Sequence, residues 1–485
     1  MISISRSLIR QFRAVARRAG LCKLGSNTTA GVRIIASSES LRLQASNGHS
    51  AVEHQMIGRF EAADLTVPWQ LFADCEAKTD GVVTIRLNDG TAIVACWEDR
   101  GVPQQHNYDS PVVPEIPIVP TEMTTNPPRL LTALRDAATT ADSASTRYAL
   151  SCVQLRGSNG LISATDSRQL LVQSGFTFPW QEELLVQATD VFASRELPHG
   201  QSVAIGRSAD FVTVQVGEWT IHQEIDKTGR FPNLERAIPS PSAIKTRMQV
   251  DAADARFLTT AVSRLPADDQ TDRPLTVELN GAIVLRARQD DQSPLMELLL
   301  SRSKRIGEQL RLQMNRKYLA RAVDMGFTEI GFVDAESPCV CQDATRTYVW
   351  MLLENKGALE PSAEALRIDS SSVQPSVTVK SPRGELAKVS SPRISSSVSG
   401  PVNRVAGHLS QSFVATINAE VTAGPSSSAK PSADVIELAL TLRNQLRTVT
   451  QGLTDLVGQI RQQRKHNRLM KSTLQSLKQL QLLEA

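Results

Sequence analysis

The sequence has few aromatic residues and no long apolar run. Aromatic side chains make up 4% of the 485 residues, so we expect cores built mainly from aliphatic side chains. The apolar stretch at residues 295–300 is interrupted by Glu297, and it is far shorter than the roughly 18 residues that a membrane span needs. The sequence therefore predicts a protein with no membrane partner.

Motifs that mark metal centres and catalytic sites are missing as well. The six cysteines include no CxxC pair and the seven histidines no HExxH motif, so no metal-ligand cluster can be recognised. The sequence also lacks a P-loop, a GxSxG motif and a GxGxxG turn that opens a helix. Scattered cysteines are typical of free thiols in a reducing compartment. We predict a cytoplasmic protein without a cofactor, a metal or a catalytic centre.

Asp166 is the acidic residue that most resembles a catalytic group. It lies in a polar turn, residues 165–168, directly after a strand-like stretch. An aspartate in such a turn commonly bonds its own backbone, and this is the simpler interpretation. An enzyme that cleaves DNA through Asp166 is kept as the weakest alternative.

The charges nearly balance, so their distribution matters more than their sum. Lys and Arg number 53 and Asp and Glu 50, which leaves a net charge of +3. Residues 6–19 predict an amphipathic helix on which arginines recur at i, i+4, i+7 and i+11: Arg6, Arg10, Arg13 and Arg17. Like charges at this spacing repel each other, so we expect an anion near this face. The basic start also imitates a transit peptide, although a structural helix fits these residues better.

The chain contains a threefold internal repeat with a period of about 122 residues. Predicted first helices cover residues 6–19, 129–142 and 251–265. Predicted second helices cover residues 68–78, 188–196 and 315–325. Strand-like alternation fills much of the rest, and the Pro-rich residues 102–128 predict a connector. Two helices packed on antiparallel sheets in each unit make an α+β fold, with domains predicted at residues 1–120, 121–245 and 246–357.

The last part of the chain changes character twice. Residues 358–431 are rich in Ser, Pro and Ala, which predicts a disordered linker. Its two Ser-Pro-Arg triplets, at residues 381–383 and 391–393, are phosphorylation sites, loose DNA contacts or ordinary linker composition. Residues 432–485 carry apolar side chains at alternating spacings of four and three, which predicts a coiled coil. We expect this helix to self-associate, or else to bind a partner or DNA.

Four segments carry a resemblance to a known family. They are similar to its second-domain strand and Ala-Thr-Asp turn, its Gly-(Arg/Lys)-Phe-Pro loop, its Asn-Ala-(Arg/Lys)-Tyr-Leu helix and its closing strand: residues 148–170, 225–239, 315–322 and 348–351. The chain thus resembles the bacterial beta sliding clamp, the processivity subunit of the replicative DNA polymerase. Ser167 and Arg168 stand where this family usually has Gly-His. The chain also continues for about 130 residues beyond the usual end of the family.

The resemblance implies a ring of two copies joined head to tail, with helices facing duplex DNA in the hole. It also implies that DNA polymerase and clamp-loader subunits insert a short apolar peptide into a cleft between the second and third domains. The residues expected to contact DNA are Arg6, Arg10, Arg13, Arg17, Tyr148, Arg316, Lys317 and Arg321. The residues expected in the cleft are Leu150, Thr165, Ser167, Arg168, Leu170, Pro232, Arg236, Ala237, Val349, Met351, Leu352 and Leu353.

We therefore expect a non-catalytic sliding clamp, a ring homodimer that keeps the replicative polymerase on double-stranded DNA. Contacts to phosphates would hold the DNA without reading its sequence. The main alternative is a divergent paralogue that acts as a protein-interaction scaffold and is not loaded on DNA. In either case the C-terminal coiled coil offers a further site for a partner.

Overall fold

The computed structural model describes residues 1–22, 31–88, 92–145, 148–267, 272–290 and 292–372. The chain divides into two units, residues 1–382 and 383–485. The second unit contains the predicted coiled coil. It lies outside the described residues, as does most of the predicted linker, so both stay predictions. In the described part, no helix combines the length and the apolar character that a bilayer span requires.

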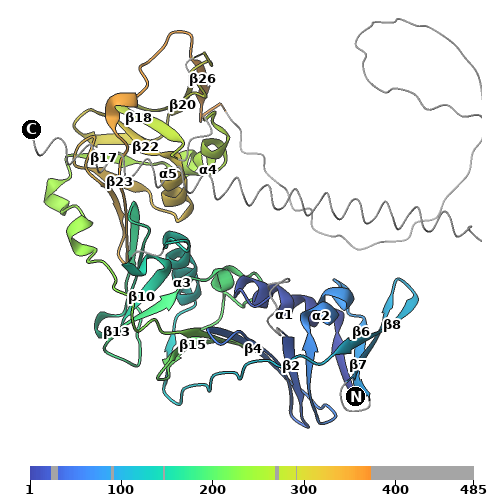
Figure 1. The fold of residues 1–485 in the computed structure, drawn as a ribbon. Coiled ribbons are helices and arrows are strands. Elements are labelled where there is room, and N and C mark those ends of the chain that lie inside the picture. Colours follow the sequence, from blue (N-terminus) through green and yellow to red (C-terminus); the bar gives the residue numbers. More distant parts are fainter. Residues whose placement is uncertain (23–30, 89–91, 146–147, 268–271, 291, 373–485) are drawn as a thin grey trace, which may run out of the picture. The chain divides into compact units, whose positions relative to one another are not determined.

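The first repeat begins with a short strand that leads directly into a helix (Figure 1). Its helices are α1 (Arg6–Arg18) and α2 (Trp69–Cys75). Its strands are β1 (Ile2–Ser5), β2 (Gly31–Ala36), β3 (Ser40–Ser46), β4 (Ser50–Ile57), β5 (Ala63–Pro68), β6 (Val82–Asn88), β7 (Ala92–Asp99) and β8 (Val102–Asp109). Ser5 caps α1, because its side-chain oxygen accepts the backbone N–H of Leu8. The predicted apolar stripe of α1 is buried, as its helical period requires.

The second repeat follows the same order with one difference. Its helix is α3 (Arg129–Thr140). Its strands are β9 (Met123–Asn126), β10 (Cys152–Arg156), β11 (Leu161–Thr165), β12 (Gln169–Gln173), β13 (Glu183–Gln187), β14 (Val203–Arg207), β15 (Phe211–Val216) and β16 (Trp219–Glu224). The predicted α-helix at residues 188–196 is wrong, because only Asp190–Ala193 turn, as a 3-10 helix. The backbone is already extended at Ser194, so the turn cannot propagate.

The third repeat has two helices, α4 (Ala252–Ala261) and α5 (Arg316–Asp324). Its strands are β17 (Thr246–Gln249), β18 (Pro274–Asn280), β19 (Ala282–Ala287), β20 (Met296–Leu300), β21 (Lys304–Gly307), β22 (Leu310–Asn315), β23 (Glu329–Phe332), β24 (Cys339–Gln342) and β25 (Arg346–Trp350). A further strand, β26 (Leu366–Asp369), follows the repeat. Figure 1 shows β26 beside β20.

Each repeat supplies two half-sheets with the same strand order. In the first repeat they are β1-β6-β7-β8 and β5-β2-β3-β4. In the second they are β9-β14-β15-β16 and β13-β10-β11-β12. In the third they are β17-β23-β24-β25, with β21 added beside β17, and β22-β18-β19-β20. This recurrence, with helices beside antiparallel strands, confirms the predicted α+β fold.

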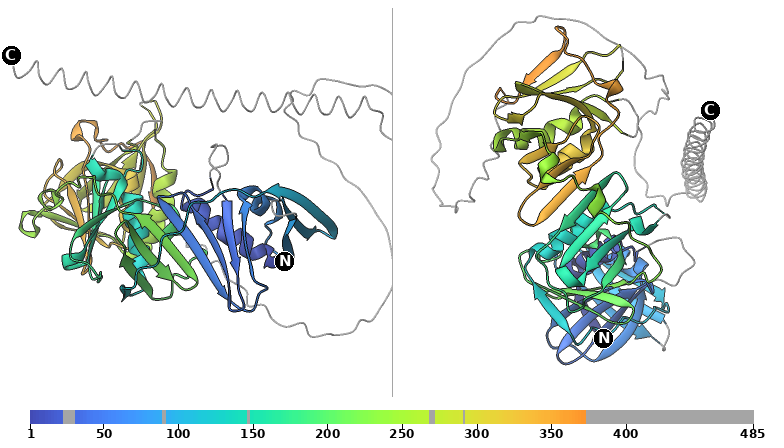
Figure 2. Two further views of the ribbon diagram at one scale, coloured as in Figure 1. Left: turned by 60° about the horizontal axis from the view of Figure 1, so that its bottom comes forward. Right: turned by 90° about the vertical axis from the view of Figure 1, so that its left-hand side faces the viewer.

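Half-sheets of neighbouring repeats join into continuous sheets. Strand β4 pairs antiparallel with β16, with Val52 opposite Ile221. Strand β12 pairs antiparallel with β25, with Leu170 opposite Val349. In the left view of Figure 2 the blue strands of the first repeat continue into the green strands of the second. Main-chain hydrogen bonds therefore tie the repeats together.

Residues 102–128 are only partly the predicted connector. Residues 102–109 form β8, which pairs antiparallel with β7. Pro103 is tolerated because β8 is an edge strand, where a missing N–H need not face a neighbour. The tight turn before it uses two positive φ angles, 52° at Arg100 and 84° at Gly101, as hairpin turns of this kind require.

Candidate partner cleft and DNA-facing helices

The turn between β11 and β12 is held by its own polar side chains. Asp166 accepts the backbone N–H groups of Arg168 and Gln169 through Oδ1, both at 2.8 Å. The Thr165 hydroxyl accepts the N–H of Ser167 at 3.1 Å and donates to the carbonyl of Gln169 at 2.7 Å. Asp166 therefore has the structural role that its place in the turn predicts. Ser167 adopts a φ of 75°, a conformation that favours glycine.

An apolar cavity of about 290 Å³ opens where β12 pairs with β25. Two residues of its lining, Leu170 and Val349, form a small buried cluster with Val340. The cavity is lined by Leu150, Thr165, Ser167, Arg168, Gln169, Leu170, Pro232, Asn233, Leu234, Ala237, Pro338, Val349, Trp350 and Met351. A concave site with aliphatic walls and a few polar groups at its rim is suited to apolar side chains of a ligand.

The structure brings nine of the twelve predicted cleft residues to this cavity. The other three lie elsewhere. Leu352 is buried in the core of the third repeat. Leu353 forms an isolated bridge with Gln313, and Arg236 is exposed. At the C-terminal end, the residues assigned to the cleft through the resemblance are therefore correct only up to Met351, because the chain turns away from the cavity after this residue.

Sequence reasoning missed five residues of the lining: Gln169, Asn233, Leu234, Pro338 and Trp350. Four of them could have been found from their neighbours, since Gln169 and Trp350 each lie between two predicted residues, and Asn233 and Leu234 follow Pro232 in the same loop. Pro338 gives no such signal. It reaches the cavity because β24 lies beside β25 in the sheet, a pairing between segments that spacing alone does not specify.

The rim of the cavity carries an ion pair between repeats. The Arg168 guanidinium lies 2.6 Å from the Asp272 carboxylate, and both side chains are substantially exposed. Exposed pairs of this kind contribute little to stability. Arg168 can therefore exchange Asp272 for an acidic or carbonyl group of a ligand at small cost.

Arg321, predicted to contact DNA, instead joins the second and third repeats. Its guanidinium donates to the carbonyls of Asp136 at 2.6 Å and Thr139 at 3.1 Å, and to the Thr140 hydroxyl at 2.7 Å. It also donates to Gln169 Oε1 at 3.2 Å. Four donors of Arg321 are thus engaged by α3 and β12, which argues against the predicted contact with phosphates.

Two further predicted DNA contacts are buried. Arg6 is 6% exposed and donates to the carbonyls of Cys75 and Glu98, each at 2.6 Å, and to the Asp99 carboxylate at 3.0 Å. Arg316 is 3% exposed, and its guanidinium donates to four backbone carbonyls: those of Leu265, Pro266, Arg273 and Pro274. Both side chains organise loops within their own repeats, so we withdraw them as DNA contacts.

The other predicted DNA contacts are more open to solvent. Arg17 and Lys317 are exposed, and the half-exposed Arg10 lies 4.0 Å from Glu196. Arg13 is mostly covered and bonds Glu76 at 2.5 Å. For Tyr148, the side chain lies outside what the structure describes. Exposed helix cations that the predicted set omitted are Arg18, Arg135, Arg256 and Arg264.

The described part of the chain has no cluster of metal ligands, and the thiols of Cys75 and Cys152 are buried. No three His, Cys, Asp or Glu side chains there converge as they would around a metal ion. Burial raises the pKa of the Cys75 thiol to about 12 and that of Cys152 to about 11. Such thiols are protonated near neutral pH and are poor nucleophiles.

No protein-family model and no curated protein matches the sequence of this chain. Solved structures do match. The DNA polymerase III subunit beta from Pseudomonas aeruginosa is 19% identical with a TM-score of 0.58, over 73% of this chain and 99% of that one. The DNA polymerase sliding clamp from Bacillus subtilis is 16% identical with a TM-score of 0.60, over 73% and 98%.

The beta subunit from Thermotoga maritima gives the same result, with 17% identity and a TM-score of 0.58 over 73% of this chain and 99% of that one. The match spans nearly the whole length of each of these proteins. This chain therefore has the sliding-clamp fold, followed by residues that the matched structures do not cover.

Proposed function

We propose that this chain, which has the sliding-clamp fold, is a DNA sliding clamp that encircles duplex DNA and tethers a DNA polymerase. The observation that carries the proposal is the similarity of fold over 98–99% of the length of three bacterial clamps. The protein would hold partners on DNA and catalyse no reaction itself. Its place of action would be the cytoplasm, where replication proceeds.

The internal repeat supports a ring made of two copies. Strand β4 of the first repeat pairs with β16 of the second, and β12 of the second pairs with β25 of the third. By the same rule, β20 of the third repeat should pair with the last strand of a first repeat, which is β8. That strand would have to come from a second copy. A head-to-tail pair of copies would satisfy both ends at once, because a closed ring leaves no unpaired interface.

The cavity between β12 and β25 supports the binding of partner peptides. Its walls contain Leu170, Val349 and Met351, which suit aliphatic or aromatic anchors. Arg168 and the backbone of the 165–168 turn can orient polar groups of the peptide. The partners proposed for this site are the replicative polymerase and subunits of a clamp loader.

The exposed helix cations support weak contacts with the DNA backbone. Arg17, Arg18, Arg135 and Lys317 are exposed on α1, α3 and α5. Contacts to phosphates are independent of base sequence and weaken as salt rises. A ring that touches DNA in this way can slide and stays attached by topology.

The decisive experiment compares retention on circular and linear DNA after loading by the host clamp loader. We expect the protein to stay on nicked circles during gel filtration in high salt, and to leave once the circles are cut. Equal loss from circles and linear DNA would overturn the proposal. That result would favour the alternative, a clamp-like interaction scaffold that is not loaded on DNA.

The scaffold alternative has one observation in its favour. Strand β26 lies against β20, at the edge where a second copy would have to pair. A chain whose own residues permanently cover this edge could not close a ring. Ring closure therefore requires that β26 can leave the edge of β20.

A further inference from the structure

Residues 353–370, called the strap here, cross the sheet β22-β18-β19-β20 of the third repeat. The strap leaves β25 and binds β22 first, where Leu353 donates its N–H to the carbonyl of Gln313 at 2.8 Å. Gln313 in turn donates to the carbonyl of Gly357 at 3.0 Å. The N–H of Leu359 then reaches the Thr276 hydroxyl of β18 at 2.9 Å. The strap thus passes from β22 over β18 toward the opposite edge.

The strap covers charges on the face of the sheet that points away from the core. Arg286 is buried there between Glu278 and Glu297, and its Nε donates to Glu297 Oε1 at 2.6 Å. The strap adds Arg367, whose Nε donates to Glu297 Oε2 at 2.7 Å, and Glu360, which pairs with Arg311. Buried charges need a complete set of partners. These ion pairs therefore hold the strap at one position on the sheet.

The strap ends as β26, which adds a parallel strand to the edge of β20. The ladder places Met296 opposite Leu366 and Leu299 opposite Asp369. Among the described ladders it is the only parallel one; the others are antiparallel. Its N–H groups continue the pairing on both sides, from Leu366 to the carbonyl of Leu295 at 2.8 Å and from Ser370 to that of Leu299 at 2.9 Å.

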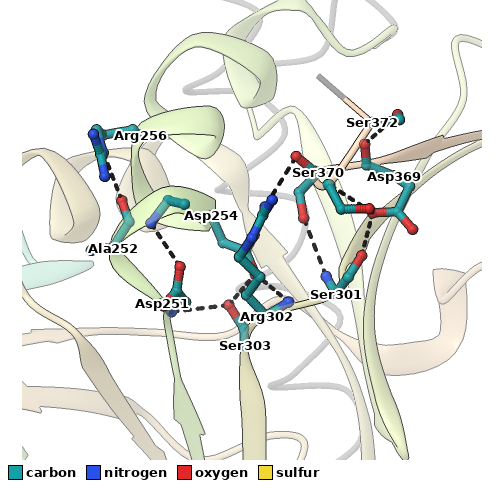
Figure 3. Close-up of polar contacts among 12 residues, drawn as sticks. Asp251, Ala252, Asp254, Arg256, Ser301, Arg302, Ser303, Asp369, Ser370 and Ser372 are labelled. Carbon is teal, nitrogen blue, oxygen red and sulfur yellow. Dashed lines mark hydrogen bonds and ion pairs between the residues drawn. The ribbon is translucent and has the colours of Figure 1, made fainter. Parts of the chain in front are cut away.

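A polar clasp fixes the end of β26, as Figure 3 shows. The Ser370 hydroxyl accepts the N–H of Ser301 at 3.2 Å, and its carbonyl accepts a bond from the Arg302 guanidinium at 3.3 Å. Arg302 also lies 3.6 Å from the buried Asp254 of α4. The clasp connects the last residues of the strap to the first turn of α4.

The cover that β26 provides is small. The strand has four residues, Leu366 is 54% exposed, and the Arg367 side chain is mostly in solvent. Parallel pairing is slightly weaker for each residue than antiparallel pairing. A longer antiparallel strand could therefore replace β26, and β8 has eight residues.

The repeat identifies the strand that belongs at this edge. Strands β4, β12 and β20 are each the third strand after the first helix of their repeats. Strands β4 and β12 pair with the last strand of the next repeat, β16 and β25. The equivalent last strand of the first repeat is β8, whose outer edge carries no other described strand.

We propose that β26 is an intramolecular plug that occupies the edge of β20 and must leave it before β8 of a second copy can pair there. The inference rests on the proposed function, since it concerns closure of the same ring. A closed strap keeps the chain from forming the ring interface, and release of β26 permits it.

The test uses the full chain with Ile368→Pro. The N–H groups of Leu366 and Ser370 point to β20, and alternate residues of a strand point the same way, so that of Ile368 does too. Proline removes this donor. Ala363→Pro is the matched control, because Ala363 is exposed in the turn before β26. Arg367→Glu, which repels Glu297 and leaves the backbone unchanged, is the second variant, with Arg367→Lys as its control.

Hydrogen exchange and sedimentation would be measured over a range of concentrations. In the wild type we expect protection at residues 366–370, and fast exchange at those N–H groups of residues 102–109 that do not face β7. Ile368→Pro and Arg367→Glu should expose residues 366–370, protect residues 102–109 as concentration rises, and strengthen self-association by about tenfold or more. The two controls should behave as the wild type does. Protection of residues 102–109 from hydrogen exchange reports pairing of β8 itself. Association through the C-terminal helix would not produce this protection.

Two outcomes would overturn the inference. One is exposure of residues 366–370 in both variants with no protection of residues 102–109. The other is a wild-type dimer in which both segments are protected together. Failure of the proposed function looks different: the released variants would pair through β8 and yet be lost equally from circular and linear DNA.

Discussion

His222 couples the stability of the second repeat to pH. Its side chain is fully buried in β16, where Nδ1 lies 3.0 Å from the Thr213 hydroxyl. Burial lowers the pKa of His222 to about 4. The unfolded chain binds a proton at the ordinary value near 6.5, so acid favours unfolding between these two pH values.

We expect the free energy of unfolding to fall by up to about 3 kcal/mol as the pH drops from 7 to 4 through His222 alone. His222→Gln, which cannot titrate there but keeps a polar group near Thr213, should flatten this dependence. Urea denaturation at pH 7 and pH 5 would measure it. Some dependence should remain, because burial also lowers the pKa of His54 despite its neighbour Glu218. An unchanged slope in His222→Gln would contradict the assignment.

Ser167 tests the backbone strain in the cleft turn. A residue with a side chain at a φ of 75° is held about 1–2 kcal/mol above its preferred conformation, a strain that glycine does not carry. Ser167→Gly should therefore be neutral or stabilising by up to about 1 kcal/mol, since glycine loses part of this gain in the unfolded state. Ser167→Ala keeps the strain and serves as the control. Thermal unfolding would compare them, and a clear loss in Ser167→Gly would show that the hydroxyl has a role in the turn.

At this scale the sequence predicts local features better than distant ones. The Asp166 turn was predictable because its bonds join residues within three positions. The burial of Arg6 was not, since its partners Cys75, Glu98 and Asp99 lie at least 69 positions away. Periodicity placed four arginines on one face of a helix. It could not show that the first of them reaches into the interior.

Helix α1 allows the structural and the DNA-binding roles of arginine to be separated. Arg6→Ala would leave two carbonyls without a buried donor, and we expect a loss of about 2–4 kcal/mol in unfolding free energy. Arg17→Ala should change stability by no more than about 0.5 kcal/mol but lower the salt dependence of DNA binding by about one unit of slope. Chemical denaturation and fluorescence anisotropy against salt would measure the two effects. Equal DNA binding by Arg17→Ala and the wild type would remove α1 from the proposed DNA surface.

The cleft is a second test for the elements that form it. Met351 is 45% exposed at the cavity, so a charge can be placed there without disturbing the core. Met351→Glu should weaken binding of the host polymerase by about tenfold or more, equal to about 1.4 kcal/mol. Ile306→Glu is the control, because Ile306 is 49% exposed on β21 and does not line the cavity. Surface plasmon resonance with immobilised polymerase would decide, and equal binding by both variants would exclude this cavity as the site.

At the scale of the whole molecule, Arg321 holds two repeats together. It spans from α5 to α3 and β12, and the Tyr348 hydroxyl donates to the same Gln169 oxygen at 2.6 Å. We expect Arg321→Ala to cost about 2–4 kcal/mol and to separate unfolding of the third repeat from that of the second. Arg264→Ala, which removes an exposed arginine of the third repeat, is the control. Calorimetry would report the split, and a single unchanged transition would contradict it.

The threefold repeat could be predicted from a period of about 122 residues, whereas the pairing between repeats could not. Residues 50–57 and 219–224 each alternate as a strand does, but alternation does not name a partner. The cavity likewise depends on a strand pairing that the sequence pattern does not specify. Leu170 and Val349 were assigned to one cleft through the resemblance, and their pairing follows from a sheet that crosses the repeat boundary.

The ladder between β4 and β16 has a consequence for synthesis of the protein. When β4 leaves the ribosome, its partner strand is still about 160 residues away in the message. At roughly 5–20 residues per second, the edge of β4 waits roughly ten to thirty seconds before β16 emerges. During that time nascent chains on one polysome expose identical edges to each other. Expression yield should therefore depend on translation speed and on chaperones that shield β4, even where the finished protein is stable.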